Sequence, residues 1–321
     1  MQQRDRIRRA LSTGYLSVPI AIGCFVLLRL FSGIDLLTFD SLAVMIIQIT
    51  IALLLLQTNY TFTIIQERTM LPAIVYLLLA GTNPLVFSDW VSNIMALGFL
   101  LCLNSILSSF REKQSSIYLF NITFLLTIGS LIWVPLLLFI PLFWFGAYYL
   151  QSLSLRSFTA SLLGVFVVIL VLFSYFVFCE GDGWKALLDS LRFSFAFDPD
   201  ILVDSRVIYT GILTLFALLH LSIPTNTEKI KNRIFLNFLC LSVLVCGIIL
   251  LFFDENGEKT KLISFSYVAL AIIIAHYFTS HKSKISFYIL IFSFVFYVAT
   301  YLLDVYHIDL TAYIPSWISL N

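Results

Sequence analysis

The chain has 321 residues, of which 60% are hydrophobic and 12% are charged, and its formal net charge is +1. A soluble domain is about 45–50% apolar and about 25% charged, so this composition leaves too little polar surface for a fold that faces water. It excludes a soluble enzyme domain, a disulfide scaffold, a nucleic-acid-binding protein and a disordered chain. We expect an all-α, polytopic transmembrane bundle that forms one integral membrane domain over residues 1–321 and has the lipid bilayer as its surroundings.

Spanning helices need about 20 mostly apolar residues, with a range of about 17–25. This length predicts eleven spans, near residues 15–33, 38–57, 70–88, 90–109, 117–134, 135–152, 157–179, 206–224, 234–252, 261–279 and 285–303. The first span follows a basic N-terminus without a small-residue cleavage site, so we interpret it as a retained anchor. Prolines set two boundaries. Asn83-Pro84 indicates a short segment that is tilted or re-entrant, and Val134-Pro135 divides an unbroken apolar stretch.

The distribution of basic residues predicts the orientation. With the N-terminus in the cytoplasm, thirteen Lys and Arg residues fall in inward segments and five in outward segments. This bias follows the positive-inside rule and predicts an N-in, C-out topology. The longest outward segment, 180–206, has apolar residues at helical spacing between Trp184 and Phe195. It predicts an amphipathic helix over 184–195 that lies on the outer membrane surface.

Three ionisable residues around the first outward loop are the candidates for a site. Arg29 lies near the outer end of the first span, where it either snorkels to the headgroups or binds the phosphate of a lipid-linked substrate. Asp35 and Asp40 follow as candidate catalytic acids, because a carboxylate there can act as a general base or bind a divalent cation. The alternative is that both are solvated loop carboxylates, with Asp40 placed favourably at the start of the next helix.

Other polar residues indicate structure rather than chemistry. His220 and His276 have no carboxylate three or four residues further on, so we expect them to pack between helices, and we expect His307 in a solvated tail. Amides such as Gln48 and Asn93 are expected to bond neighbouring helices. The five cysteines form no CxxC pair, and no GxxxxGK[ST], GxSxG or HExxH motif occurs. The sequence therefore predicts no metal site and no particular cofactor.

Short motifs in the middle of the chain carry a family resemblance. They are Gln57-Thr-Asn-Tyr60, Leu71-Pro72, Asn83-Pro84, Ile128-Gly-Ser-Leu-Ile-Trp-Val-Pro135 and Leu155-Arg-Ser-Phe158. In these motifs and in its hydropathy rhythm, the chain resembles an uncharacterised family of polytopic inner-membrane proteins from Bacteroidota over roughly residues 55–180. The resemblance implies a multi-pass protein of the bacterial cytoplasmic (inner) membrane and assigns no activity.

A more distant resemblance concerns the arrangement of spans. The short hairpins, the Leu-Pro pair that opens one span and the Gly-Ser…Val-Pro span are similar to the membrane region of the polyprenyl-phosphate-sugar-dependent, GT-C-like glycosyltransferases. This resemblance implies catalytic acids in the first outward loop, here Asp35 and Asp40, with Arg29 as a phosphate contact and 184–195 as an interfacial helix. That family pairs its acids closely in a long loop, whereas here they are five residues apart in a short one.

Three functions stay open at this point. The first is a non-enzymatic subunit or scaffold in cell-envelope assembly, with envelope proteins as partners, which predicts an exposed apolar stripe and no polar cavity. The second is a glycosyltransferase-like protein that handles a polyprenyl- or lipid-linked substrate at the outer face, with Arg29, Asp35 and Asp40 lining one cavity. The third is a transporter of a neutral or lipid substrate, which needs a polar site near the midplane.

Overall fold

A computed structural model describes residues 14, 16–31, 38–67, 69–112, 115–180, 204–222, 230–252, 256–281 and 283–306. Within these ranges every regular element is helical, which confirms the all-α prediction. The elements are α2 (Ser17–Phe31), α3 (Phe39–Phe62), α4 (Leu71–Gly81), α5 (Pro84–Ser88), α6 (Trp90–Ser108), α7 (Ser115–Gly129), the 3-10 helix η1 (Val134–Leu138), α8 (Phe139–Tyr149), α9 (Leu155–Glu180), α11 (Ser205–Ser222), α12 (Ile230–Leu250), α13 (Asn256–Ser280) and α14 (Lys284–Val305).

Six helices in the described part of the chain are long and apolar enough to cross a membrane. They are Phe39–Phe62, Trp90–Ser108, Leu155–Tyr175, Ile230–Leu250, Lys259–Ser280 and Lys284–Val305. The other predicted spans contain apolar helices of 10–17 residues. Hydrocarbon offers the backbone no hydrogen-bond partner, and a helix satisfies its own N–H and C=O groups, which is why apolar sequence of this length takes this form. The predicted interfacial helix over 184–195 lies outside the described residues.

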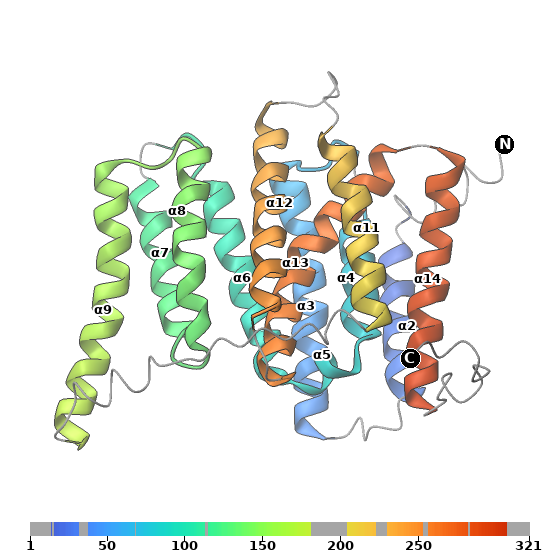
Figure 1. Ribbon diagram of the computed structural model, residues 1–321, viewed down its shortest axis with the longest axis horizontal. Helices are drawn as coiled ribbons and strands as arrows, with labels where there is room; N and C mark the ends of the chain where they lie inside the picture. Colours follow the sequence, from blue (N-terminus) through green and yellow to red (C-terminus); the bar gives the residue numbers. More distant parts are fainter. Residues whose placement is uncertain are drawn as a thin grey trace, which may run out of the picture.

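The helices run in alternating directions between two ends of the bundle (Figure 1). We call the end where α11 and α13 begin and α14 ends the lower end, as it appears in Figure 1, and the opposite one the upper end. α7, α8 and α9 form one side of the bundle and α2 and α14 the other. The first turn of α3 and the breaks before α6 and η1 therefore all lie at the lower end.

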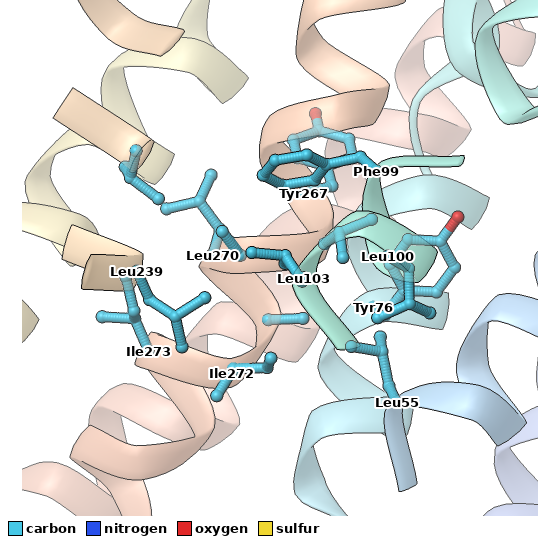
Figure 2. Packing of buried hydrophobic residues seen from close by; sticks show 14 of the residues in the cluster. Leu55, Tyr76, Phe99, Leu100, Leu103, Leu239, Tyr267, Leu270, Ile272 and Ile273 are labelled. Carbon is cyan, nitrogen blue, oxygen red and sulfur yellow. The ribbon is translucent and has the colours of Figure 1, made fainter. Parts of the chain in front are cut away.

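α13 is the central helix. Within its candidate membrane span, Lys259–Ser280, 94% of the most apolar stretch is buried inside the bundle. It packs against α4, α6, α11 and α12. Figure 2 shows side chains from α3, α4, α6 and α12 meeting those of α13. The rings of Phe99 and Phe265 stack with centroids 3.6 Å apart, and Phe139 tilts against Phe265 at 4.5 Å. In a bilayer this close packing, rather than the hydrophobic effect, holds helices together.

Glycines permit two close approaches on the α7–α9 side. A Cβ on Gly164 of α9 would lie 2.5 Å from Thr123 Oγ1 and 2.8 Å from the carbonyl oxygen of Phe120, both on α7. A Cβ on Gly129, where α7 ends, would lie 2.6 Å from Leu136. The chain turns back directly after Gly129 and enters η1, so the predicted division at Pro135 marks a real break, with the preceding helix ending a few residues earlier than expected.

Candidate functional site: a broken helix and a lateral cavity

The segment predicted as one span over 70–88 is broken. α4 ends at Gly81, and Thr82 caps it with its N–H bonded to the carbonyl of Leu78. Asn83 follows in extended backbone, and α5 begins at Pro84. The Asn83 side chain accepts a hydrogen bond from the Leu85 N–H at 3.1 Å, and the Asp89 side chain accepts one from the Val91 N–H at 3.0 Å, so each caps the helix that follows. Proline at the first position of α5 suits this arrangement because it needs no hydrogen bond there.

A chain of buried polar side chains holds the break to α2 and α3. Arg29 Nη2 donates to Gln48 Oε1 at 3.0 Å, and Gln48 Nε2 donates to Asn93 Oδ1 at 2.9 Å. Asn93 Nδ2 donates in turn to the carbonyl oxygens of Val86 at 2.7 Å and Asp89 at 2.8 Å. The amides thus bond neighbouring helices, as expected, and they satisfy carbonyl groups that α5 leaves open.

The sequence candidates for a catalytic site are not brought together among the described residues. The Arg29 side chain is only 1% exposed and points to Gln48, so the snorkelling interpretation is wrong. Asp40 is exposed in the first turn of α3, eight residues before Gln48, or about 12 Å along the helix. Asp35 lies outside the described residues. Arg29 thus donates to an amide deep in α3, and Asp40 lies two turns away from that amide.

A second set of polar side chains, from α11, α13 and α14, contacts the break between α4 and α5. Arg206 Nη2 lies 2.7 Å from Asp304 Oδ2, and Arg206 Nη1 donates to the carbonyl oxygen of Thr82 at 3.1 Å. Asn83 Nδ2 donates to the hydroxyl of Tyr267 at 3.0 Å. A guanidinium at the end of α4 also complements the negative end of its dipole. In the sequence, Arg206 appears only as a basic residue of an outward segment. Its contacts cannot be predicted there, because its partners lie on α4 and α14.

A cavity of about 370 Å³ lies beside this group, between α11, α12 and α13. Its floor consists of buried side chains, among them Thr210, Thr214, Cys246, Leu262, Tyr267 and Leu270. Its rim is formed by exposed apolar side chains: Leu215 on α11, and Leu244 and Ile248 on α12. A buried floor with an exposed apolar rim means that the cavity opens sideways, on the flank of the bundle.

Two glycines leave this space open. Gly211 of α11 and Gly247 of α12 line the cavity, and a Cβ on either would meet no atom within 4 Å. A larger side chain at these positions would occupy the space above the floor. The sequence carries no signal that pairs these two residues, because glycine is frequent in membrane helices in general.

The hydroxyl groups on the cavity wall already form hydrogen bonds within the protein. Thr214 Oγ1 donates to the carbonyl of Thr210, and Ser266 Oγ donates to the carbonyl of Ile263. Thr210 Oγ1 lies 2.6 Å from the carbonyl of Arg206, and the Tyr267 hydroxyl accepts from Asn83. Such a wall offers few hydrogen bonds to water or to a sugar, so it is better suited to contact with a hydrocarbon chain.

The three histidines in the described part of the chain lie at the upper end, away from the broken helix and the lateral cavity. The His220 ring packs against Tyr277 and His281, with centroids 5.6 and 5.3 Å away, and the buried His276 contacts Ser280 at 3.3 Å. Both therefore pack against neighbouring side chains, as expected. Within the described ranges no three His, Cys, Asp or Glu residues are grouped so that they could hold a metal ion. His307 lies outside those ranges.

Comparison with known protein families, with curated proteins and with solved structures finds no match to this chain.

Proposed function

We propose that this protein is a multi-pass protein of the bacterial cytoplasmic membrane that acts in cell-envelope assembly without catalysis, by holding the hydrocarbon chain of a lipid in the cavity between α11, α12 and α13. The observation that carries the proposal is the cavity itself, which opens sideways between helices and has an apolar rim. The choice of membrane rests on the family resemblance of the middle of the chain, and the process is that of the scaffold alternative that the sequence leaves open.

The size of the cavity supports a hydrocarbon occupant. The cavity has a volume of about 370 Å³ and extends over nine residues of α13, from Leu262 to Leu270, or about 12 Å along the helix axis. An extended lipid chain fits a slot of this length that opens sideways and is lined mainly by apolar side chains.

The topology of the proposal is N-in, C-out with eleven crossings. Six helices are long enough to cross alone, and the shorter apolar helices, including α4 with α5 and η1 with α8, supply the remaining crossings. The excess of basic residues at the upper end supports placing that end in the cytoplasm. The cavity, which runs from the lower part of α11 and α13 to about the middle of the bundle, then lies mainly in the outer leaflet.

The polar residues support a role without catalysis. Arg29, Gln48 and Asn93 bond one another, and Arg206 bonds Asp304 and α4, so their side chains serve contacts between helices. A glycosyltransferase-like site would need Arg29, Asp35 and Asp40 to line one cavity, and of these Asp35 lies outside the described residues. A transporter of a polar substrate would need a polar site between the helices. The lateral cavity has neither property.

Filling the cavity tests the proposal. Gly211→Leu and Gly247→Leu place a side chain in the slot. We expect native mass spectrometry in mild detergent to detect a single bound lipid on the wild-type protein, and we expect each of these variants to lose it. Gly23→Leu and Gly98→Leu are matched controls, because a Cβ there also meets open space but neither residue lines the cavity. Equal lipid retention in all four variants would refute the proposal.

A further inference from the structure

We propose that the lipid held in the cavity is an acyl ester and that the Tyr267 hydroxyl donates a hydrogen bond to its ester carbonyl. This inference rests on the proposed function, because it names the chemical class of the ligand for the same cavity. It starts from Tyr267 of α13, which lines the cavity and is only 5% exposed. A phenol hydroxyl can accept and donate at the same time, so its bonding is complete only when both capacities are used.

The Asn83 side chain uses the accepting capacity of Tyr267. Asn83 Oδ1 accepts from the Leu85 N–H at 3.1 Å, and this cap fixes which end of the amide faces α5. Asn83 Nδ2 therefore faces Tyr267 and donates to its hydroxyl oxygen at 3.0 Å. Because the nitrogen of an amide offers no acceptor, the proton of the Tyr267 hydroxyl is not used in this contact.

The charged groups around this contact do not take that proton. Among the described residues, Arg206 and Asp204 act electrostatically on the Tyr267 hydroxyl. The Arg206 guanidinium, which lies 2.7 Å from Asp304, has no acceptor, and Asp204 accepts from the Arg206 backbone N–H at 2.9 Å. In the contacts observed for the described part of the chain, Asn83 is the hydrogen-bond partner of this hydroxyl. The hydroxyl therefore keeps one donor for a ligand in the cavity that Tyr267 lines.

The depth of the hydroxyl matches the boundary between the chains of a lipid and its headgroup. Side chains on a helix lean toward its N-terminus, so Tyr267 extends from α13 toward the lower end. Its hydroxyl meets Asn83 in the break after α4, next to the carbonyl that Arg206 contacts from the first turn of α11. In the proposed topology, this level lies at the outer edge of the hydrocarbon, where a glycerolipid carries its ester carbonyls.

The experiment measures ester preference with the full chain in mild detergent. The detergent contains equimolar dioleoylphosphatidylethanolamine, a diester, and its diether analogue with the same headgroup and chain length. Native mass spectrometry gives the ratio of the two lipids in the singly bound protein. We expect the wild type to prefer the diester about fivefold, because the diether lacks the carbonyl that accepts the hydrogen bond. Tyr267→Phe removes only the hydroxyl and should lower the ratio to about one.

Two variants are the controls. Tyr277→Phe removes a hydroxyl from the same helix outside the cavity lining, and it should keep the wild-type ratio. Asn83→Ser keeps a capping oxygen for α5 but is too short to reach Tyr267, so it removes the bond between the two side chains and leaves the phenol hydroxyl in place. It should also keep the ratio. If Tyr267 acted only by supporting the break, Asn83→Ser would lower the ratio as much as Tyr267→Phe.

Equal retention of the two lipids by the wild type, or equal loss of the preference in Tyr267→Phe and Asn83→Ser, would overturn the role of Tyr267 and leave the cavity as a lipid site. Where Tyr267→Phe does not yield monodisperse protein, the wild-type ratio decides whether the ligand is held through an ester. Absence of a bound lipid on the wild type, or its retention in Gly211→Leu, would instead overturn the proposed function.

Discussion

The buried polar chain that holds the broken helix is best tested at its central residue. Gln48 makes two side-chain hydrogen bonds, one from Arg29 at 3.0 Å and one to Asn93 at 2.9 Å. It is fully buried on α3. Gln48→Met keeps the length and most of the volume of the side chain and removes both bonds, so the change in stability reports on the hydrogen bonds rather than on a cavity.

The expected loss follows from the two bonds. Hydrogen bonds between membrane helices average about 0.6 kcal/mol and reach about 1.7 kcal/mol. A buried polar atom that loses its partner costs about 1–3 kcal/mol, and the substitution takes one partner from Arg29 Nη2 and one from Asn93 Oδ1. We therefore expect Gln48→Met to lower the free energy of unfolding by about 2–4 kcal/mol.

The assay is reversible unfolding of the purified protein by SDS in mixed micelles. Thr50→Val is the matched control on the same helix, because Thr50 is exposed and bonds only the Ile46 carbonyl one turn away in the contacts observed. We expect it to change stability by less than about 0.5 kcal/mol. If Gln48→Met matched this control, the polar chain would not support the break. Combining Gln48→Met with Asn93→Leu should give less than the sum of the two losses, since both remove the same bond.

Three further predictions concern topology, packing and catalysis. Asp40→Cys at the lower end should react with a membrane-impermeant maleimide on intact cells, and Arg111→Cys at the upper end should react only after lysis; the reverse pattern would overturn the N-in, C-out topology. Gly164→Ala should lower the free energy of unfolding by about 1–3 kcal/mol in the SDS assay, because its Cβ would collide with α7, whereas Gly98→Ala meets open space and should not destabilise. The double variant Asp35→Asn with Asp40→Asn should fully complement a deletion strain if the protein acts without catalysis, and loss of complementation would favour the glycosyltransferase-like alternative.

The hydropathy pattern predicts where helices lie because it reports the contact of each segment with hydrocarbon. It predicts their ends less well, since those depend on other helices. The span predicted over 38–57 continues to Phe62 as α3. Its last turns contain Thr58, which donates to Asn104 of α6 at 2.7 Å, and Asn59, whose side chain accepts from the Ile65 N–H at 3.0 Å. These polar residues predict a loop when the sequence is considered alone. They are helical in the structure because neighbouring segments supply partners for their hydrogen bonds.

Arg29 shows the same dependence at the level of function. Arg29 lies four residues before the end of an apolar run, and this position in the sequence indicates a contact with lipid headgroups. In the structure its side chain turns inward because Gln48 lies beside it on α3. The cavity is a stronger case, because Gly211 and Gly247 are 36 positions apart and line the same cavity only when α11 and α12 both pack on α13. In a chain of this composition, the cavity arises where glycines leave side chains out, and the polar residues that stand out in the sequence mainly hold the helices together.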